Sequence, residues 1–107
     1  MAAIAEMTCS DLSSAYRRGS LSPVEVARDC LARIEAHKAL NAFMPMEPER
    51  TLAAAAESEK RWRAGQPLGP IDGMPTSIKD NVWAKGWPTR RGSKTSDAAP
   101  AQADAPA

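Results

Sequence analysis

The chain has 107 residues, 14 of them basic and 13 acidic, a length that suits one small domain. This balance provides no basic field for a nucleic acid or an anionic lipid surface, so we expect this segment to bind neither. Leu, Ile, Val and Phe make up only about 13% of the residues, below the roughly 20% at which a chain becomes doubtful as a self-sufficient globule, so we expect it to be part of a larger protein.

The N-terminal residues MAAIAEMTCSD lack the basic segment and apolar run of a secretory leader, and no stretch approaches the ~18 apolar residues of a membrane span. A cytoplasmic location without membrane contact is therefore expected. Cys9 and Cys30 do not have the spacing of metal ligands, and His37 is the only histidine. We accordingly expect no metal and no cofactor.

Residues 8–37 are predicted to form two helices. The first is capped by Thr8 and stopped by Gly19, a residue that readily adopts the left-handed conformation at a helix end. The second begins with Ser22 and Glu25 in the spacing of a capping box. Its apolar positions recur with helical periodicity, and the predicted core face consists of Ala27, Cys30, Leu31 and Ile34.

The apolar stretch LNAFMPM at 40–46 is interrupted by Pro45 and is predicted to be an edge strand or an extended link. A third helix is expected over 48–64, because Pro48 suits a first turn and the alanine-rich run that follows favours helix. Gly65 supplies the stop signal.

Residues 65–82 are predicted to be a loop followed by a buried strand that carries Lys79 into an Asp-Asn turn. The loop is indicated by its Gly and Pro content. The strand is indicated by β-branched residues, namely Thr76, Ile78 and Val82. Residues 93–107 contain almost nothing to bury and are predicted to be a disordered tail.

A lysine at the end of a strand has two interpretations. It is most often a solvated residue whose ammonium group reaches water and protects the strand from aggregation. Alternatively, a lysine such as Lys79 is held among apolar and hydrogen-bonding groups, where its neutral amine can act as a base. A Ser-Lys pair is an established substitute for Ser-His in activating a hydroxyl nucleophile.

Three motifs favour the second interpretation for Lys79. The segments LSPVEVARDCLARIEAHKALNAF, GPIDGMPTSIKDN and TRRGS together resemble, in order and spacing, the N-terminal part of the amidase signature family. The resemblance implies an α/β fold with a mixed sheet covered by helices on both faces. Residues 1–107 would supply the N-terminal helices and the first core strand of that domain. They would thus form only its N-terminal part.

The resemblance also implies an activity. Members of this family hydrolyse or transfer small carboxamides with a Ser, cis-Ser and Lys triad, and the family lysine falls on Lys79. By the same resemblance, Asp80 and Asn81 support the turn that follows. Gly73 is expected to support the entry to the strand by allowing close backbone approach.

The two serines of that triad lie, in family members, in a glycine- and serine-rich segment well beyond residue 107. Ser93 and Ser96 do not replace them, because neither has the neighbouring glycines that bring backbone donors to an oxyanion. We therefore expect the isolated chain to be inactive.

Two other functions are left open by the sequence. In one, the complete protein is the subunit that releases ammonia from glutamine for tRNA-dependent amidation, which would make it part of an obligate complex. In the other, the chain is a non-catalytic module that docks its alanine-rich helices on a partner. A cooperative denaturant melt of the free chain would favour the module, whereas weak helicity would favour a fragment.

Overall fold

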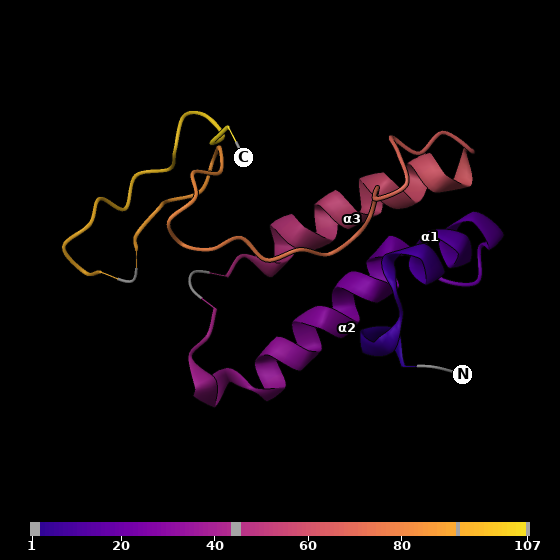
Figure 1. Cartoon of the computed structure of the whole chain (residues 1–107), viewed down its shortest axis with the longest axis horizontal. Helices are drawn as coiled ribbons and strands as arrows, with labels where there is room; N and C mark the ends of the chain where they lie inside the picture. The colour runs from indigo at the N-terminus through magenta and orange to yellow at the C-terminus, as the bar shows by residue number, and fades with distance from the viewer. Residues whose placement is uncertain (1–2, 44–45, 92, 107) are drawn as a thin grey trace. The chain divides into compact units, whose positions relative to one another are not determined.

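The computed structural model describes residues 3–43, 46–91 and 93–106 (Figure 1). It divides into two compact units, Met1–Pro75 and Thr76–Ala107, and the first contains all the helices found in the described residues. Along the chain these are the 3₁₀ helix η1 (Ile4–Glu6), α1 (Cys9–Arg18), α2 (Pro23–Ala36), the 3₁₀ helix η2 (Lys38–Leu40) and α3 (Pro48–Arg63). None of them is both long and apolar enough to cross a membrane.

The caps predicted for the first two helices are confirmed. Ahead of α1, the Asp11 backbone N–H donates to Thr8 Oγ1 (3.1 Å), while the Thr8 N–H donates to the Asp11 carboxylate (3.0 Å). Ser22 and Glu25 form the same reciprocal pair ahead of α2, at 3.1 and 3.2 Å. Gly19 ends α1 with φ +76°. These bonds satisfy amide groups that have no acceptor within the helix.

The core of the first unit lies where α1, α2 and α3 meet. Its buried cluster consists of Leu12, Tyr16, Val26 and Trp62. The rings of Tyr16 and Trp62 are tilted by 55° with their centroids 5.7 Å apart, a favourable arrangement for two aromatic groups. The face predicted for α2 is confirmed, since Ala27 is buried and the other three predicted residues are half-buried. The third helix also agrees with its prediction, ending at Arg63 shortly before Gly65.

The link after α2, predicted to be an edge strand or an extended link over 40–46, contains no strand in its described residues. The chain continues as the η2 turn, and Asn41 then adopts a left-handed conformation with φ +52°, which asparagine tolerates better than most residues. Residues 44–45, including Pro45, lie outside the described residues. Leu40 and Phe43 remain exposed, so the described part of the link has no strand partner and no burial to hold it extended.

The second unit consists of turns, bends and two isolated bridges, Lys85 with Ala101 and Pro88 with Pro100. The buried strand predicted to carry the lysine is not present in residues 76–82, and Ile78 is 58% exposed. A strand needs a neighbouring ladder to pair its backbone groups, and the described residues of this chain contain no such ladder. The mixed sheet thus stays a proposal for the complete domain. The disorder predicted for 93–107 in solution also stays a prediction.

Candidate functional site

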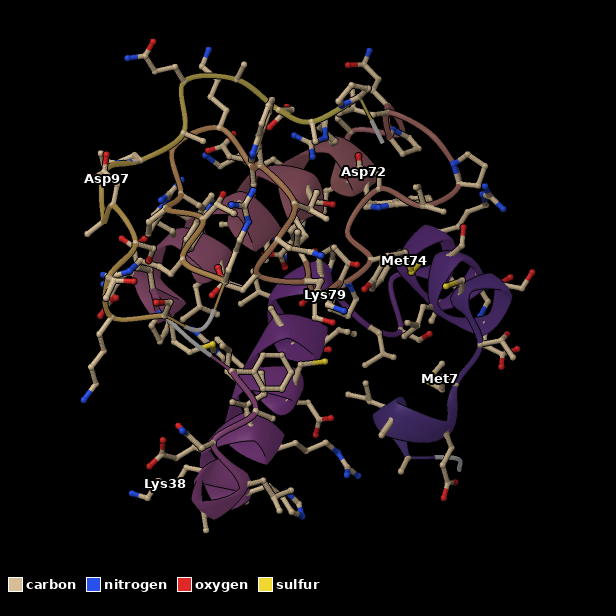
Figure 2. All side chains as sticks on the ribbon, turned by 60° about the vertical axis from the view of Figure 1, so that its left-hand side comes forward. Met7, Lys38, Asp72, Met74, Lys79 and Asp97 are labelled. Carbon is tan, nitrogen blue, oxygen red and sulfur yellow. The ribbon has the colours of Figure 1, made fainter. Side chains whose placement is uncertain are left out.

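Lys79 opens a tight turn in the second unit (Figure 2). Its carbonyl oxygen accepts a hydrogen bond from the backbone N–H of Val82 at 3.0 Å, so the Asp-Asn turn predicted from the sequence is confirmed. The side chains of Lys79 and Asn81 are exposed, whereas Asp80 between them is half-buried. Lys79, Asp80 and Asn81, three of the four predicted site residues, therefore lie in one turn. Lys79 is its first residue.

Asp80 ties this turn to a segment ten residues further along the chain. Its Oδ1 accepts a hydrogen bond from the backbone N–H of Arg90 at 2.8 Å. Its backbone carbonyl accepts a second one from the N–H of Arg91 at 2.9 Å. The structure thus joins two motifs that the sequence analysis could only note as separate matches.

The segment held by Asp80 is itself closed by local hydrogen bonds. The Ser93 N–H donates to the Arg90 carbonyl (2.9 Å), and Arg90 Nε donates to Ser96 Oγ (3.1 Å). The Ser96 hydroxyl in turn donates to the Ser93 carbonyl at 2.7 Å. In this structure the hydroxyl of Ser96 serves to stabilise a turn.

Gly73, the fourth predicted residue, lies in the first unit, where α2 and α3 approach its backbone. A Cβ atom at this position would lie 2.7 Å from Ser58 Oγ and 2.8 Å from Pro23 Cγ, and the φ angle is +83°. The Gly73 carbonyl accepts a hydrogen bond from the Tyr16 hydroxyl at 2.9 Å. Burial raises the pKa of Tyr16 to about 12. The close backbone approach expected of this glycine is therefore present.

Asp72 is a residue whose role the sequence analysis missed. It accepts two hydrogen bonds from the Arg61 guanidinium (2.8 and 2.7 Å), one from the Ser58 hydroxyl (2.8 Å) and one from the Leu68 N–H (2.9 Å). Its carbonyl accepts from the Trp62 indole at 2.9 Å. The one available signal was the Asp-Gly dipeptide, typical of a turn. Asp72 fastens the loop that leads toward the lysine segment to α3.

The bidentate bond from Arg61 holds the pKa of Asp72 well below its ordinary value, and the bonds from Leu68 and Ser58 act in the same direction. Because the folded pKa is the lower one, Asp72 stabilises the fold fully above the unfolded value near 3.8. That contribution is lost as the pH falls below this value. In a folded protein that contains this unit, we expect the urea midpoint to fall between about pH 5 and pH 2.5, and Asp72→Asn to flatten this fall while lowering the midpoint at pH 7.

The control for this prediction is Asp11→Asn. Bonds from Thr8 also lower the pKa of Asp11, but this carboxylate is exposed, and solvent screening makes its contribution to stability small. The control variant should therefore retain most of the pH dependence. An Asp72→Asn variant whose midpoint falls with acid as steeply as that of the unchanged protein would contradict the assignment.

A groove of about 330 Å³ also lies in the first unit. Its lining includes Tyr16, Arg17 and Trp62, and none of the four predicted site residues is among the lining residues. In the ranges that the structure describes, no three His, Cys, Asp or Glu side chains are grouped so that they could hold a metal ion. What the lysine turn offers chemically is an amine, which can take up a proton when it is neutral.

Residues 25–107 match a family model described as Amidase. The chain is 46% identical over 80 residues to the A subunit of the mitochondrial glutamyl-tRNA(Gln) amidotransferase of Ornithorhynchus anatinus, covering 75% of this chain and 15% of that protein. It is 43% identical over 89 residues to the corresponding amidotransferase subunit of Chloroflexus aggregans, covering 82% of this chain and 18% of that protein. The chain thus spans less than a fifth of the length of these curated relatives.

Proposed function

Because this chain belongs to the amidase family, we propose that it is the N-terminal part of an enzyme that hydrolyses carboxamides with Lys79 as its base. The observation that carries the proposal is the position of Lys79 inside the matched residues 25–107, at the head of a turn that Asp80 anchors. An amine that removes a proton in catalysis must be held in place relative to the hydroxyl that it serves.

The proposed mechanism uses a serine, a cis-serine and Lys79. The neutral lysine amine takes a proton from the bridging cis-serine, which in turn takes one from the nucleophilic serine. The serine oxygen attacks the amide carbonyl, the nitrogen leaves as ammonia or an amine after receiving a proton, and water hydrolyses the resulting ester. In this proposal both serines come from polypeptide outside the 107 residues.

A second candidate is favoured by the names of the relatives. The relatives from Ornithorhynchus anatinus, Chloroflexus aggregans and Homo sapiens are all named as the A subunit of a glutamyl-tRNA(Gln) amidotransferase. If this chain shares that role, the complete protein releases ammonia from glutamine and works within a complex. Glutamine hydrolysis that depends on a co-purifying second subunit would favour this candidate. Hydrolysis of carboxamides by the complete protein alone would favour a free-standing amidase.

A chimera tests the proposal directly. In the Chloroflexus aggregans relative, the 89 aligned residues are replaced by those of this chain, and the relative supplies the rest of the polypeptide. Release of ammonia from glutamine, measured in that relative's own complex, should stay within about tenfold of the parental rate. A chimera that is folded and assembled but releases no ammonia would overturn the proposal, and the unmodified relative serves as the control.

The isolated 107-residue chain is expected to release no ammonia from glutamine, asparagine or a simple aliphatic amide. A base without its hydroxyl partners has nothing to activate. An exposed lysine alone does not accelerate the attack of water on an amide, so hydrolysis should stay at the uncatalysed rate. The assay compares the chain with its Lys79→Ala variant at equal concentration. Turnover by the unchanged chain that disappears in the variant would contradict this expectation.

A further inference from the structure

Within the part of the chain that the structure describes, two groups of Asp80 accept hydrogen bonds from consecutive residues. The carboxylate receives the N–H of Arg90 at 2.8 Å, and the backbone carbonyl receives the N–H of Arg91 at 2.9 Å. Two bonds from one residue to two adjacent amides fix both its position and its orientation. The half-buried setting of Asp80 strengthens them, because water competes less for the same groups.

The backbone that donates these bonds is also constrained. Arg91 has a φ of +52°, a left-handed conformation that costs a residue with a side chain on the order of 1 kcal/mol or more. Such a conformation persists only where the surroundings enforce it. One of those contacts is the bond that the Arg91 N–H makes to Asp80.

This attachment bears on Lys79 because Lys79 and Asp80 are neighbours in the chain. A lysine side chain is long and flexible, so its amine is directed first by the position of its own backbone. On the N-terminal side, Ile78 is 58% exposed, and its burial in this chain contributes little to holding that backbone. On the C-terminal side, Asp80 holds it through the two bonds to Arg90 and Arg91.

We propose that Asp80 is the positioning residue for Lys79 and that it acts as a hydrogen-bond acceptor, not through its negative charge. This inference rests on the proposed function, since it concerns the placement of the base in that reaction. It goes beyond a general supporting role because it names the two amides that Asp80 holds. It also predicts which property of the side chain matters.

The first test compares Asp80→Asn with Asp80→Ala in the chimera. Asparagine keeps an oxygen that can accept from Arg90 but loses the charge, whereas alanine loses both. We expect Asp80→Ala to lower kcat about 100-fold with KM changed by less than about threefold, as for a base displaced by about 1 Å. Asp80→Asn should stay within about fivefold of the unchanged chimera, with the same shape of pH-rate profile. If Asp80→Asn loses as much activity as Asp80→Ala, the charge is what matters and the proposal is overturned.

The second test breaks the same attachment from its other side and leaves Asp80 intact. Arg91→Pro removes the N–H that donates to the Asp80 carbonyl and forces φ to about −65°, whereas Arg91→Gly keeps the N–H and adopts a positive φ readily. Both variants lose the arginine side chain, so they differ in the backbone N–H, the φ angle and the proline ring. We expect Arg91→Pro to reproduce the loss of kcat seen in Asp80→Ala, and Arg91→Gly to stay within about threefold of the unchanged chimera. Equal activity of the two variants would overturn the proposal.

Amide hydrogen exchange of the chimera provides a readout that does not need turnover. The amide of Arg90 should exchange at least about tenfold faster in Asp80→Ala than in Asp80→Asn, because only asparagine retains a side-chain acceptor for it. The Arg91 amide donates to the Asp80 backbone carbonyl, which both variants keep. Unchanged exchange at the Arg90 amide in Asp80→Ala would count against the attachment. This comparison, with the Arg91 pair, decides the matter even if one variant folds poorly.

The activities of these variants separate a failure of the base role of Lys79 from a failure of the positioning role of Asp80. If Lys79→Ala keeps its activity, the proposed function is wrong whatever Asp80 does. If Lys79→Ala is inactive while Asp80→Ala and Arg91→Pro are both fully active, the lysine keeps its role and only the positioning by Asp80 is refuted.

Discussion

Lys79→Ala in the chimera is expected to lower kcat for glutamine hydrolysis by on the order of 10³-fold or more, since the loss of a general base costs about 10²- to 10⁴-fold and members of a catalytic triad act as a unit. Lys79 stands at the head of a turn fastened at Asp80, so its removal should leave the surrounding backbone in place. KM should change little, because the amine acts on a protein hydroxyl. Initial rates of ammonia release over a range of glutamine concentrations separate the two parameters.

Two control variants sharpen this result. Lys79→Arg keeps a positive charge but has no neutral form near pH 7, so it should be as inactive as the alanine variant if the residue is a base. Lys94→Ala removes another exposed lysine of the same unit and should stay within about twofold of the unchanged chimera. Should Lys79→Arg retain more than about a tenth of the activity, the lysine would be acting as a charge and its assignment as a base would be wrong.

Gly73→Ala is expected to reduce the free energy of unfolding by about 3 kcal/mol. The methyl group would lie 2.7 Å from Ser58 Oγ and 2.8 Å from Pro23 Cγ, and overpacking of this kind costs about 1–3 kcal/mol. The positive φ adds about 1–2 kcal/mol for any residue with a side chain. Urea unfolding of the chimera, followed by circular dichroism, measures it.

Gly19→Ala is the matched control for this change. Gly19 has a similar φ of +76°, but nothing lies within 4 Å of the position that its Cβ would take. Its substitution should therefore carry the backbone cost alone, about 1 kcal/mol. If the two variants lose the same stability, close packing at Gly73 does not contribute and the interpretation of that contact is wrong.

The helical part of the fold could be predicted from local signals. Thr8 and Ser22 stand three positions before an acidic residue, and both make the predicted capping boxes. The apolar periodicity after Pro23 identified the face of α2 that packs into the core. These signals are reliable because a cap or a helical face depends on residues within one or two turns of each other.

The candidate site was only partly predictable. The Lys79 turn followed from an Asp-Asn dipeptide and from the family resemblance, and its hydrogen bond to Val82 confirms the turn. The strand before it is absent from the described residues, since β-branched residues favour a strand only where another strand can pair with them. The attachment of Asp80 to Arg90 was not predicted, because a carboxylate near a turn has many possible donors.

The helices, their caps and the lysine turn were determined by residues close together in the chain. The partners in those interactions are only a few positions apart, so few alternative partners compete with them. The tertiary structure alone decided that Asp72 accepts from Arg61 and Ser58, that Tyr16 reaches Gly73, and that Asp80 holds Arg90. Each of these contacts joins residues 10 to 57 positions apart. Closing such a loop costs conformational entropy whatever its sequence, so only the packing of the whole unit selects which polar groups meet.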